Sequence, residues 1–208
     1  MNIESYTTVL NEGKFEYEDR RSVFIGTAVP IKNEDEALDF ISYIKKKYPD
    51  ARHHVYAYVL RENSIMRFSD DREPQGTAGL PVLDAIRKRG CTNVAVVVIR
   101  YFGGTLLGTG GLVRAYSAAA VGAIENAVIV RYDVYDCIEL ICSYSDYQKV
   151  TAYLDSSGFK ITNTEYSDSV IISGKVPKDS FEHFNREVNE ATAGRAKIKI
   201  LEEIFDFV

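Results

Sequence analysis

The sequence lacks any long apolar segment free of charge, which excludes a membrane-spanning helix of the usual length. Its first residues, Met1 to Ser5, contain no cationic region and no apolar run, so the pattern of a secretory signal peptide is missing as well. These two absences predict a cytoplasmic protein with no membrane partner.

Cysteine and histidine are scarce, with three residues of each among 208. Cys91, Cys137 and Cys142 form no Cys-x-x-Cys pair, so we expect free thiols, no metal site and no cofactor. A basic excess is missing too, because 25 Lys and Arg face 30 Asp and Glu. The formal charge of −5 argues against a general nucleic-acid coat protein but leaves room for a local basic patch.

The length and the apolar content of 46% suffice for one or two domains with a real core. The pattern changes character between Val128 and Asp136, which predicts a domain over residues 1–131 and another over residues 132–208. Strands and helices follow each other as β-α-β-β-α-β in the second half, an order typical of a ferredoxin-like domain. We interpret this half as an interaction surface, a dimer contact or a lid, without predicting the oligomeric state.

The first half contains several predicted strands, over residues 6–10, 15–17, 22–29, 53–60 and 65–68. A helix is expected to begin at a capping box formed by Asn33 and Glu36 and to end before Pro49. A second helix is expected from Pro81 to Gly90. Strands with helices on one side predict an α+β sandwich.

The most informative stretch runs from Val94 to Ala127. Six apolar residues from Val94 to Ile99 predict a buried strand, and a helical pattern follows Gly111. Between the two lie five glycines within nine residues: Gly103, Gly104, Gly108, Gly110 and Gly111. Exposed amides beside a helix N-terminus make a site for an anion. Tight packing of a turn explains the same glycines without a ligand, and no standard nucleotide-binding motif accompanies them.

Five candidate residues for acid–base chemistry lie between positions 53 and 73. Asp70, Asp71 and Glu73 are candidate catalytic carboxylates, although carboxylates in a loop also cap helices and pair with arginines. His53 and His54 are candidate proton carriers. Because neighbours on a strand point to opposite faces, at most one of the two histidines can face a given site.

Three blocks of sequence are long and unusual enough to indicate a family: Ala51 to His54, Ser69 to Gly79, and Arg100 to Tyr116. They resemble the IMPACT/YigZ family in its two-domain bacterial form. The resemblance implies an α+β chain, with an N-terminal ribosomal protein S five domain-2-like α/β sandwich and a ferredoxin-like C-terminal domain. The pair is similar to the last two domains of elongation factor G. Arg72 departs from the family pattern, which usually has Gly there.

The resemblance also implies a link to translation, because IMPACT-type members act in its control in eukaryotes. Together with the residues, it suggests a binding and regulatory protein that holds a phosphate-like anion at the glycine loop. RNA, a ribosome-associated or translation factor, or a nucleotide would supply the phosphate. The expected ligand-binding residues are Arg52, Arg72, Thr77, Arg100, Gly103, Gly104, Gly108, Thr109, Gly110, Gly111 and Arg114.

Further residues are expected near this pocket. Arg67 is expected to add positive charge, and Tyr101, Phe102 and Tyr116 are candidates for stacking on a base or ribose, or else for the core.

Two other functions remain open at this point. One is an enzyme acting on a small phosphorylated or peptide substrate, with the acidic loop as acid or base and a histidine assisting. The other is a protein–protein adaptor in which the glycine loop only packs.

Overall fold

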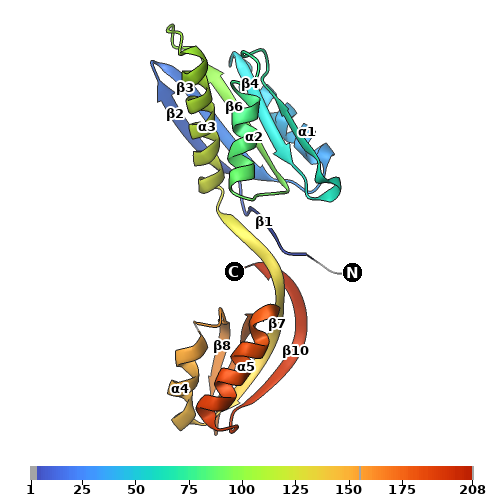
Figure 1. The fold of residues 1–208 in the computed structure, drawn as a ribbon, viewed down its shortest axis with the longest axis vertical. Helices are drawn as coiled ribbons and strands as arrows, with labels where there is room; N and C mark the ends of the chain where they lie inside the picture. Colours follow the sequence, from blue (N-terminus) through green and yellow to red (C-terminus); the bar gives the residue numbers. More distant parts are fainter. Residues whose placement is uncertain (1–3, 155, 208) are drawn as a thin grey trace. The chain divides into compact units, whose positions relative to one another are not determined.

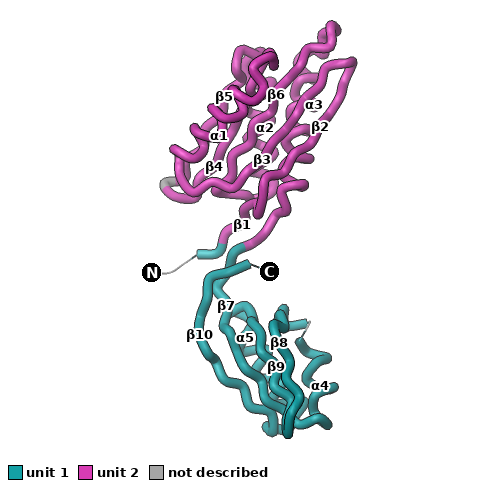
Figure 2. The backbone as a smooth tube through the Cα atoms, turned by 180° about the vertical axis from the view of Figure 1, so that it is seen from behind, with its two compact units in different colours: residues 1–5, 132–208 teal, residues 6–131 magenta. Residues whose placement is uncertain are grey.

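A computed structural model describes residues 4–154 and 156–207. The chain folds into two compact units (Figure 2). We name residues 6–131 the N-terminal unit, and residues 132–207 with residues 4 and 5 the C-terminal unit. The sequence pattern predicts that residues 4 and 5 belong to the N-terminal domain. The structure groups them with the C-terminal unit, where the Ser5 hydroxyl donates a hydrogen bond to Asp133 at 3.0 Å.

The N-terminal unit is built on one antiparallel sheet with the strand order β2-β3-β6-β4-β5. Its strands are β2 (Gly13–Asp19), β3 (Ser22–Pro30), β4 (His53–Val59), β5 (Met66–Ser69) and β6 (Val94–Tyr101). Strand β6 takes the centre because its apolar residues suit burial on both faces. The short strand β1 (Tyr6–Val9) lies outside this sheet and bridges to Cys91 through Thr7.

Helices cover both faces of this sheet (Figure 1). The side chains of Val94, Val96 and Val98 join the core under α2 (Gly79–Lys88) and α3 (Gly108–Asn126). Alternate residues of β6 point the other way, and Ala95 and Val97 join the core under α1 (Glu34–Lys47). The prediction of helices on one side alone is therefore wrong. Periodicity reveals that a helix has an apolar face but not which side of the sheet that face covers.

Small residues let α3 press against the sheet. A Cβ added to Gly26 of β3 would lie 2.3 Å from the carbonyl oxygen of Ala119, and Ala119, Ala120 and Ala123 are fully buried. Helix α3 begins at Gly108, earlier than the sequence pattern predicts. Its first residues include three glycines, which have no side chain and so add nothing to an apolar periodicity.

The start of α1 confirms the predicted capping box. The Asn33 side chain accepts a hydrogen bond from the Glu36 amide at 2.9 Å, and the Glu36 carboxylate accepts one from the Lys32 amide at 2.8 Å. A short 3-10 turn (Glu62–Ser64) joins β4 to β5. Within the described residues, no helix is long and apolar enough to cross a membrane.

The C-terminal unit has the element order predicted for a ferredoxin-like domain. Its elements are β7 (Ile129–Cys142), α4 (Tyr144–Leu154), β8 (Lys160–Tyr166), β9 (Val170–Pro177), α5 (Lys178–Thr192) and β10 (Lys197–Phe207). The strands pair in the order β10-β7-β9-β8, all antiparallel. Val150 of α4 and Phe184 of α5 share one core with Ile138 and Ile172 of the sheet. This arrangement confirms the predicted fold class.

Candidate functional site

A cleft of about 380 Å³ opens where the loop between β5 and α2 meets the start of α3. It is lined by Arg52, His53, Arg72, Glu73, Pro74, Arg100, Phe102, Leu106, Leu107, Gly108, Thr109 and Leu112. We call it the arginine cleft. His53 begins β4 and pairs with Arg100 near the end of the neighbouring antiparallel strand β6, which brings both residues to one end of the sheet.

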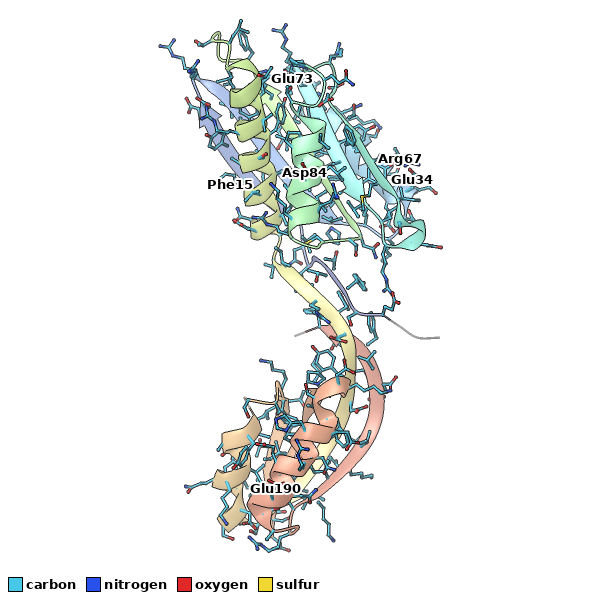
Figure 3. All side chains as sticks on the ribbon, in the orientation of Figure 1. Phe15, Glu34, Arg67, Glu73, Asp84 and Glu190 are labelled. Carbon is cyan, nitrogen blue, oxygen red and sulfur yellow. The ribbon has the colours of Figure 1, made fainter. Side chains whose placement is uncertain are left out.

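Glu73 and Arg100 form the floor of the arginine cleft. An Oε1 atom of Glu73 accepts hydrogen bonds from Arg100 Nη1 at 2.6 Å and from the Tyr116 hydroxyl at 2.9 Å. All three residues are buried. Burial, followed by the charge of Glu73, raises the pKa of Tyr116, so its hydroxyl stays protonated and remains a donor. Figure 3 shows Glu73 next to the first turns of α3.

Two aromatic rings contact the Arg100 guanidinium in addition to its ion pair with Glu73. Its guanidinium lies 5.4 Å from the centre of the Phe24 ring and 5.5 Å from that of the Phe102 ring. One of its donors, Nε, is buried without a hydrogen-bond partner. A buried donor without an acceptor costs free energy and calls for an explanation at a site of this kind.

The two histidines lie on opposite faces of β4, as the strand pattern predicts. The His53 Nδ1 atom is 2.8 Å from the carbonyl oxygen of Asp71, and because a carbonyl only accepts, Nδ1 carries the proton. The remaining nitrogen, Nε2, lies 3.7 Å from Glu73 Oε1. His54 instead contacts the carbonyl oxygen of Tyr48 through Nε2 and does not line the arginine cleft.

Asp70 and Asp71 hold the loop in shape. The Asp70 carboxylate accepts hydrogen bonds from the amides of Gly76, Ala78 and Gly79 at 2.8–3.1 Å, which caps the start of α2. The Asp71 carboxylate accepts one from the His54 amide at 2.6 Å. Neither carboxylate lines the arginine cleft, so of the three carboxylates proposed for catalysis only Glu73 reaches it.

Arg52 and Arg72 are the uncompensated charges of the cleft. Neither guanidinium has an acidic partner among the described residues, and both side chains are exposed. Arg52 lies 5.6 Å from the centre of the Phe102 ring. Arg72 has φ +70°, the left-handed conformation in which glycine is at ease and other residues are strained. The turn thus has the geometry that the usual family glycine suits.

The glycine loop divides into packing and lining positions. The Gly103 amide donates to the Ser22 hydroxyl at 3.1 Å, and a Cβ at Gly103 would overlap the Arg21 backbone. Gly111 is buried, and an added Cβ there would lie 2.9 Å from the Leu107 side chain. Gly104, with φ +84°, forms the turn between them. The reading of these glycines as packing residues therefore applies to part of the loop.

Two residues of the glycine loop line the arginine cleft. Gly108 and Thr109 line the arginine cleft at the first turn of α3, and Gly108 has φ +73°. Leu107, which precedes this turn, offers no side-chain hydrogen bond to its amides. An uncapped helix start with a partial positive charge is the local feature that favours an anion.

Other predicted residues lie outside the cleft. Thr77 is buried, and its hydroxyl donates to the Pro74 carbonyl at 2.7 Å. Gly110 and Arg114 are exposed on α3 without lining the arginine cleft. Arg67 lies beside Glu34, with 4.0 Å between Arg67 Nε and the Glu34 carboxylate, well away from Glu73 (Figure 3). The expectation that Arg67 adds charge to the pocket is wrong because Arg67 lies against Glu34 of α1, which covers the face of the sheet opposite α2 and α3.

Sequence reasoning missed the apolar wall of the cleft and the hydrogen bond from Tyr116 to Glu73. Leu106 and Leu107 carry no charge and no motif of their own, so no pattern singles them out. Tyr116 supplies a donor to Glu73 and fills the core, where its ring meets Phe24 edge to face at 5.1 Å. The available signal was the only aromatic residue in a helix rich in glycine and alanine. In residues 4–154 and 156–207, no three His, Cys, Asp or Glu side chains gather as metal ligands.

Fold and cleft together define a two-domain α+β protein with an arginine-lined cleft at the start of a helix. The family model for the Impact N-terminal domain matches residues 20–124, and that for a domain of unknown function (DUF1949) matches residues 140–195. The chain belongs to the IMPACT family, which confirms the resemblance seen in the sequence.

Individual relatives match over most of the chain. IMPACT family member YvyE of Bacillus subtilis (strain 168) is 34% identical over 198 residues, covering 95% of this chain and 91% of that protein. IMPACT family member YigZ of Escherichia coli (strain K12) is 32% identical over 189 residues, covering 89% and 93%. A solved structure described as the crystal structure of an hypothetical protein is 30% identical with a TM-score of 0.60, covering 96% of this chain and 98% of that one.

Proposed function

We propose that this IMPACT family member is a cytoplasmic binding and regulatory protein linked to translation, and that it recognises a phosphate-bearing ligand in the arginine cleft. RNA is the ligand that we favour, ahead of a nucleotide or a ribosome-associated factor. The observation that carries the proposal is the pair of uncompensated guanidiniums, Arg52 and Arg72, beside the uncapped first turn of α3. Arginine forks and backbone amides match phosphate oxygens.

The overall charge makes this local arrangement informative. With a formal charge of −5, the chain repels polyanions in general, so RNA binding has to depend on a local positive site. Phe102 lies on the wall of the cleft and is 40% exposed, which offers an aromatic surface to a base.

The test measures binding of a fluorescent single-stranded RNA at several salt concentrations. We expect affinity to fall as salt rises, with a log–log slope of about −0.7 for each neutralised phosphate. Arg52→Gln should weaken binding and reduce that slope. Arg67→Gln, at the far edge of the sheet, is the matched control and should change neither. RNA binding that is absent, or that is insensitive to Arg52→Gln, contradicts the proposal.

Acid–base catalysis is a second candidate function, favoured by the fixed tautomer of His53 with Nε2 at the cleft floor beside Glu73. It is tested by following release of inorganic phosphate from a phosphorylated nucleotide. On this reading His53→Gln abolishes turnover, while His54→Gln, on the opposite face of the same strand, retains it. No turnover by the unmodified protein excludes this candidate for that substrate.

A further inference from the structure

We infer that the arginine cleft selects a terminal phosphomonoester at the end of a nucleic-acid strand over the phosphodiesters within the strand. The inference rests on the proposed function, because it specifies which phosphate of a nucleic acid occupies the same site. Four properties of the cleft carry it: its uncompensated charge, its number of hydrogen-bond donors, the unpartnered Nε of Arg100 and its closed floor.

The charge of the cleft matches a dianion. Glu73 neutralises Arg100 through a 2.6 Å contact at the floor. Arg52 and Arg72 remain as two positive charges with no acidic partner among the described residues. A phosphomonoester carries about −1.5 to −2 at neutral pH, whereas each phosphodiester carries one negative charge. The monoester is therefore the better electrostatic complement.

The donors of the cleft also match a terminal phosphate. Arg52, Arg72, Gly108 and Thr109 line one small space. They carry two guanidinium forks, one hydroxyl and the amides of the first two residues of α3, whose start has no side-chain cap. A phosphomonoester presents three strong acceptor oxygens to these groups. A phosphodiester has only two non-bridging oxygens, because two of its four oxygens join the chain, and it leaves more donors without a partner.

A second observation points to an anion independently of the helix. Arg100 is 5% exposed, lines the arginine cleft, and has a buried Nε with no hydrogen-bond partner. The contact to Glu73 balances the charge of Arg100 but leaves its Nε donor without an acceptor. An anion seated above the guanidinium adds negative potential at this donor, since charges interact strongly where water is excluded.

The closed floor favours the end of a strand over a strand that continues in both directions. Glu73, Arg100 and Leu112 are all buried, so the cleft ends there and does not run through the unit. A volume of about 380 Å³ is at the lower end of the range for small-molecule sites and suits one terminal group. An internal phosphate would have to bring the chain on both sides into this space, whereas the end of a strand enters alone.

The experiment compares two RNA oligonucleotides of one sequence, with a 5′-phosphate and with a 5′-hydroxyl, by fluorescence anisotropy at fixed salt. A third oligonucleotide carries the phosphate at its 3′ end. We expect about tenfold tighter binding of an end-phosphorylated strand, the size expected for one or two extra charge-assisted hydrogen bonds. Phosphatase treatment of the phosphorylated RNA should remove the difference.

Variants place the preference in the cleft. Arg52→Gln and Arg72→Gln should each weaken binding of the 5′-phosphate strand more than binding of the 5′-hydroxyl strand, so that the preference for the end phosphate falls. Arg114→Gln is the matched control, because Arg114 is exposed on α3 outside the arginine cleft. All three side chains are exposed, so the variants should fold, which circular dichroism melts check.

The outcomes separate the two proposals. Equal binding of the phosphorylated and hydroxyl strands overturns this inference and leaves the proposed function standing. Absence of binding to every RNA overturns both. A preference that survives in the Arg52→Gln and Arg72→Gln double variant overturns the assignment to the cleft. Tighter binding of a phosphorylated peptide than of the phosphorylated RNA overturns the choice of nucleic acid.

Discussion

Both units contain ion pairs, but the N-terminal unit also has two guanidiniums beside a cleft that lack an acidic partner among the described residues. In the C-terminal unit, Asp146 contacts both Arg195 at 2.7 Å and Lys149 at 3.2 Å, and Lys175 contacts Asp206 at 2.6 Å. In the N-terminal unit, Arg52 and Arg72 face an open cleft without an acidic partner among the described residues. Ion pairs of this kind hold elements of the fold together. Charged side chains that lack a partner beside a cavity instead indicate where a ligand supplies the opposite charge.

Their cores differ as well. The N-terminal sheet has helices on both faces, so its central strand is almost wholly apolar. In the C-terminal unit, β9 alternates between buried and half-buried residues, because the two helices cover one face of the sheet. The unit with the larger core also contains the strained turn and the buried ion pair, features that a larger core tolerates more easily.

The strongest test of this comparison is Glu73→Ala. It leaves the Arg100 guanidinium buried without its carboxylate, and we expect the N-terminal unit to lose about 3–5 kcal/mol of unfolding free energy. Hydrogen exchange resolved by segment should show β4 and β6 losing protection while β7 and β9 keep theirs. The double variant Glu73→Leu with Arg100→Met should recover most of the loss. Unchanged protection of β6 would contradict the role given to Glu73.

Matched glycine variants test whether each unit has its own core. A Cβ at Gly26 would lie 2.3 Å from the Ala119 carbonyl oxygen, and one at Gly174 would lie 2.4 Å from that of Lys160. We expect Gly26→Ala and Gly174→Ala to cost about 1–3 kcal/mol or more, each in its own unit. Gly110→Ala is the control, because a Cβ at Gly110 would have no atom within 4 Å and should change the unfolding free energy little. Gly90→Ala does not serve, because Gly90 has a positive φ. Loss of protection in both units after either change would break the comparison.

Arg72→Gly separates stability from binding. Glycine adopts φ +70° without the strain that Arg72 bears, so we expect a gain of about 1 kcal/mol in unfolding free energy. The same change removes one of the two free guanidiniums and should weaken binding of the end-phosphorylated RNA. Urea denaturation and anisotropy on the same samples measure the two effects. A gain in stability without a loss of affinity would show that Arg72 does not contact the ligand.

The smallest expected effect is an opposite pH response of the two units. Hydrogen bonds from Arg195 hold the pKa of Asp146 below its ordinary value, so its contribution to stability is present above about pH 4 and is lost as the pH falls further. Burial, followed by the hydrogen bond to Glu34, raises the pKa of Tyr58 to about 12. Its contribution is present below about pH 10 and is lost as the pH rises toward 12.

Urea denaturation at a series of pH values measures the unfolding free energy. Hydrogen exchange on pH-jumped samples then assigns each change in stability to one of the two units. Asp146→Asn should flatten the acid loss in the C-terminal unit, and Tyr58→Phe should flatten the alkaline loss in the N-terminal unit. An acid loss that is unchanged in Asp146→Asn would assign it to other carboxylates.

Much of the fold could be predicted from the sequence. The capping box of Asn33 and Glu36, the apolar strand from Val94 to Ile99 and the β-α-β-β-α-β order are local patterns, and local patterns survive folding when the tertiary structure agrees with them. The start of α3 could not be predicted, because Gly108, Gly110 and Gly111 have no side chains and add nothing to the apolar periodicity. The face that α1 covers depends on how the chain crosses the sheet, which no local pattern records.

The sequence by itself determined which elements form, which family the chain resembles and which polar residues are unusual enough to examine. Only the tertiary structure decided which of them share a cleft. Asp70 and Glu73 are three positions apart, yet the carboxylate of one caps α2 and that of the other forms the floor of the arginine cleft. The reason is physical: hydrogen bonds to particular backbone amides and to Arg100 turn neighbouring side chains in different directions, and those partners come from distant parts of the chain.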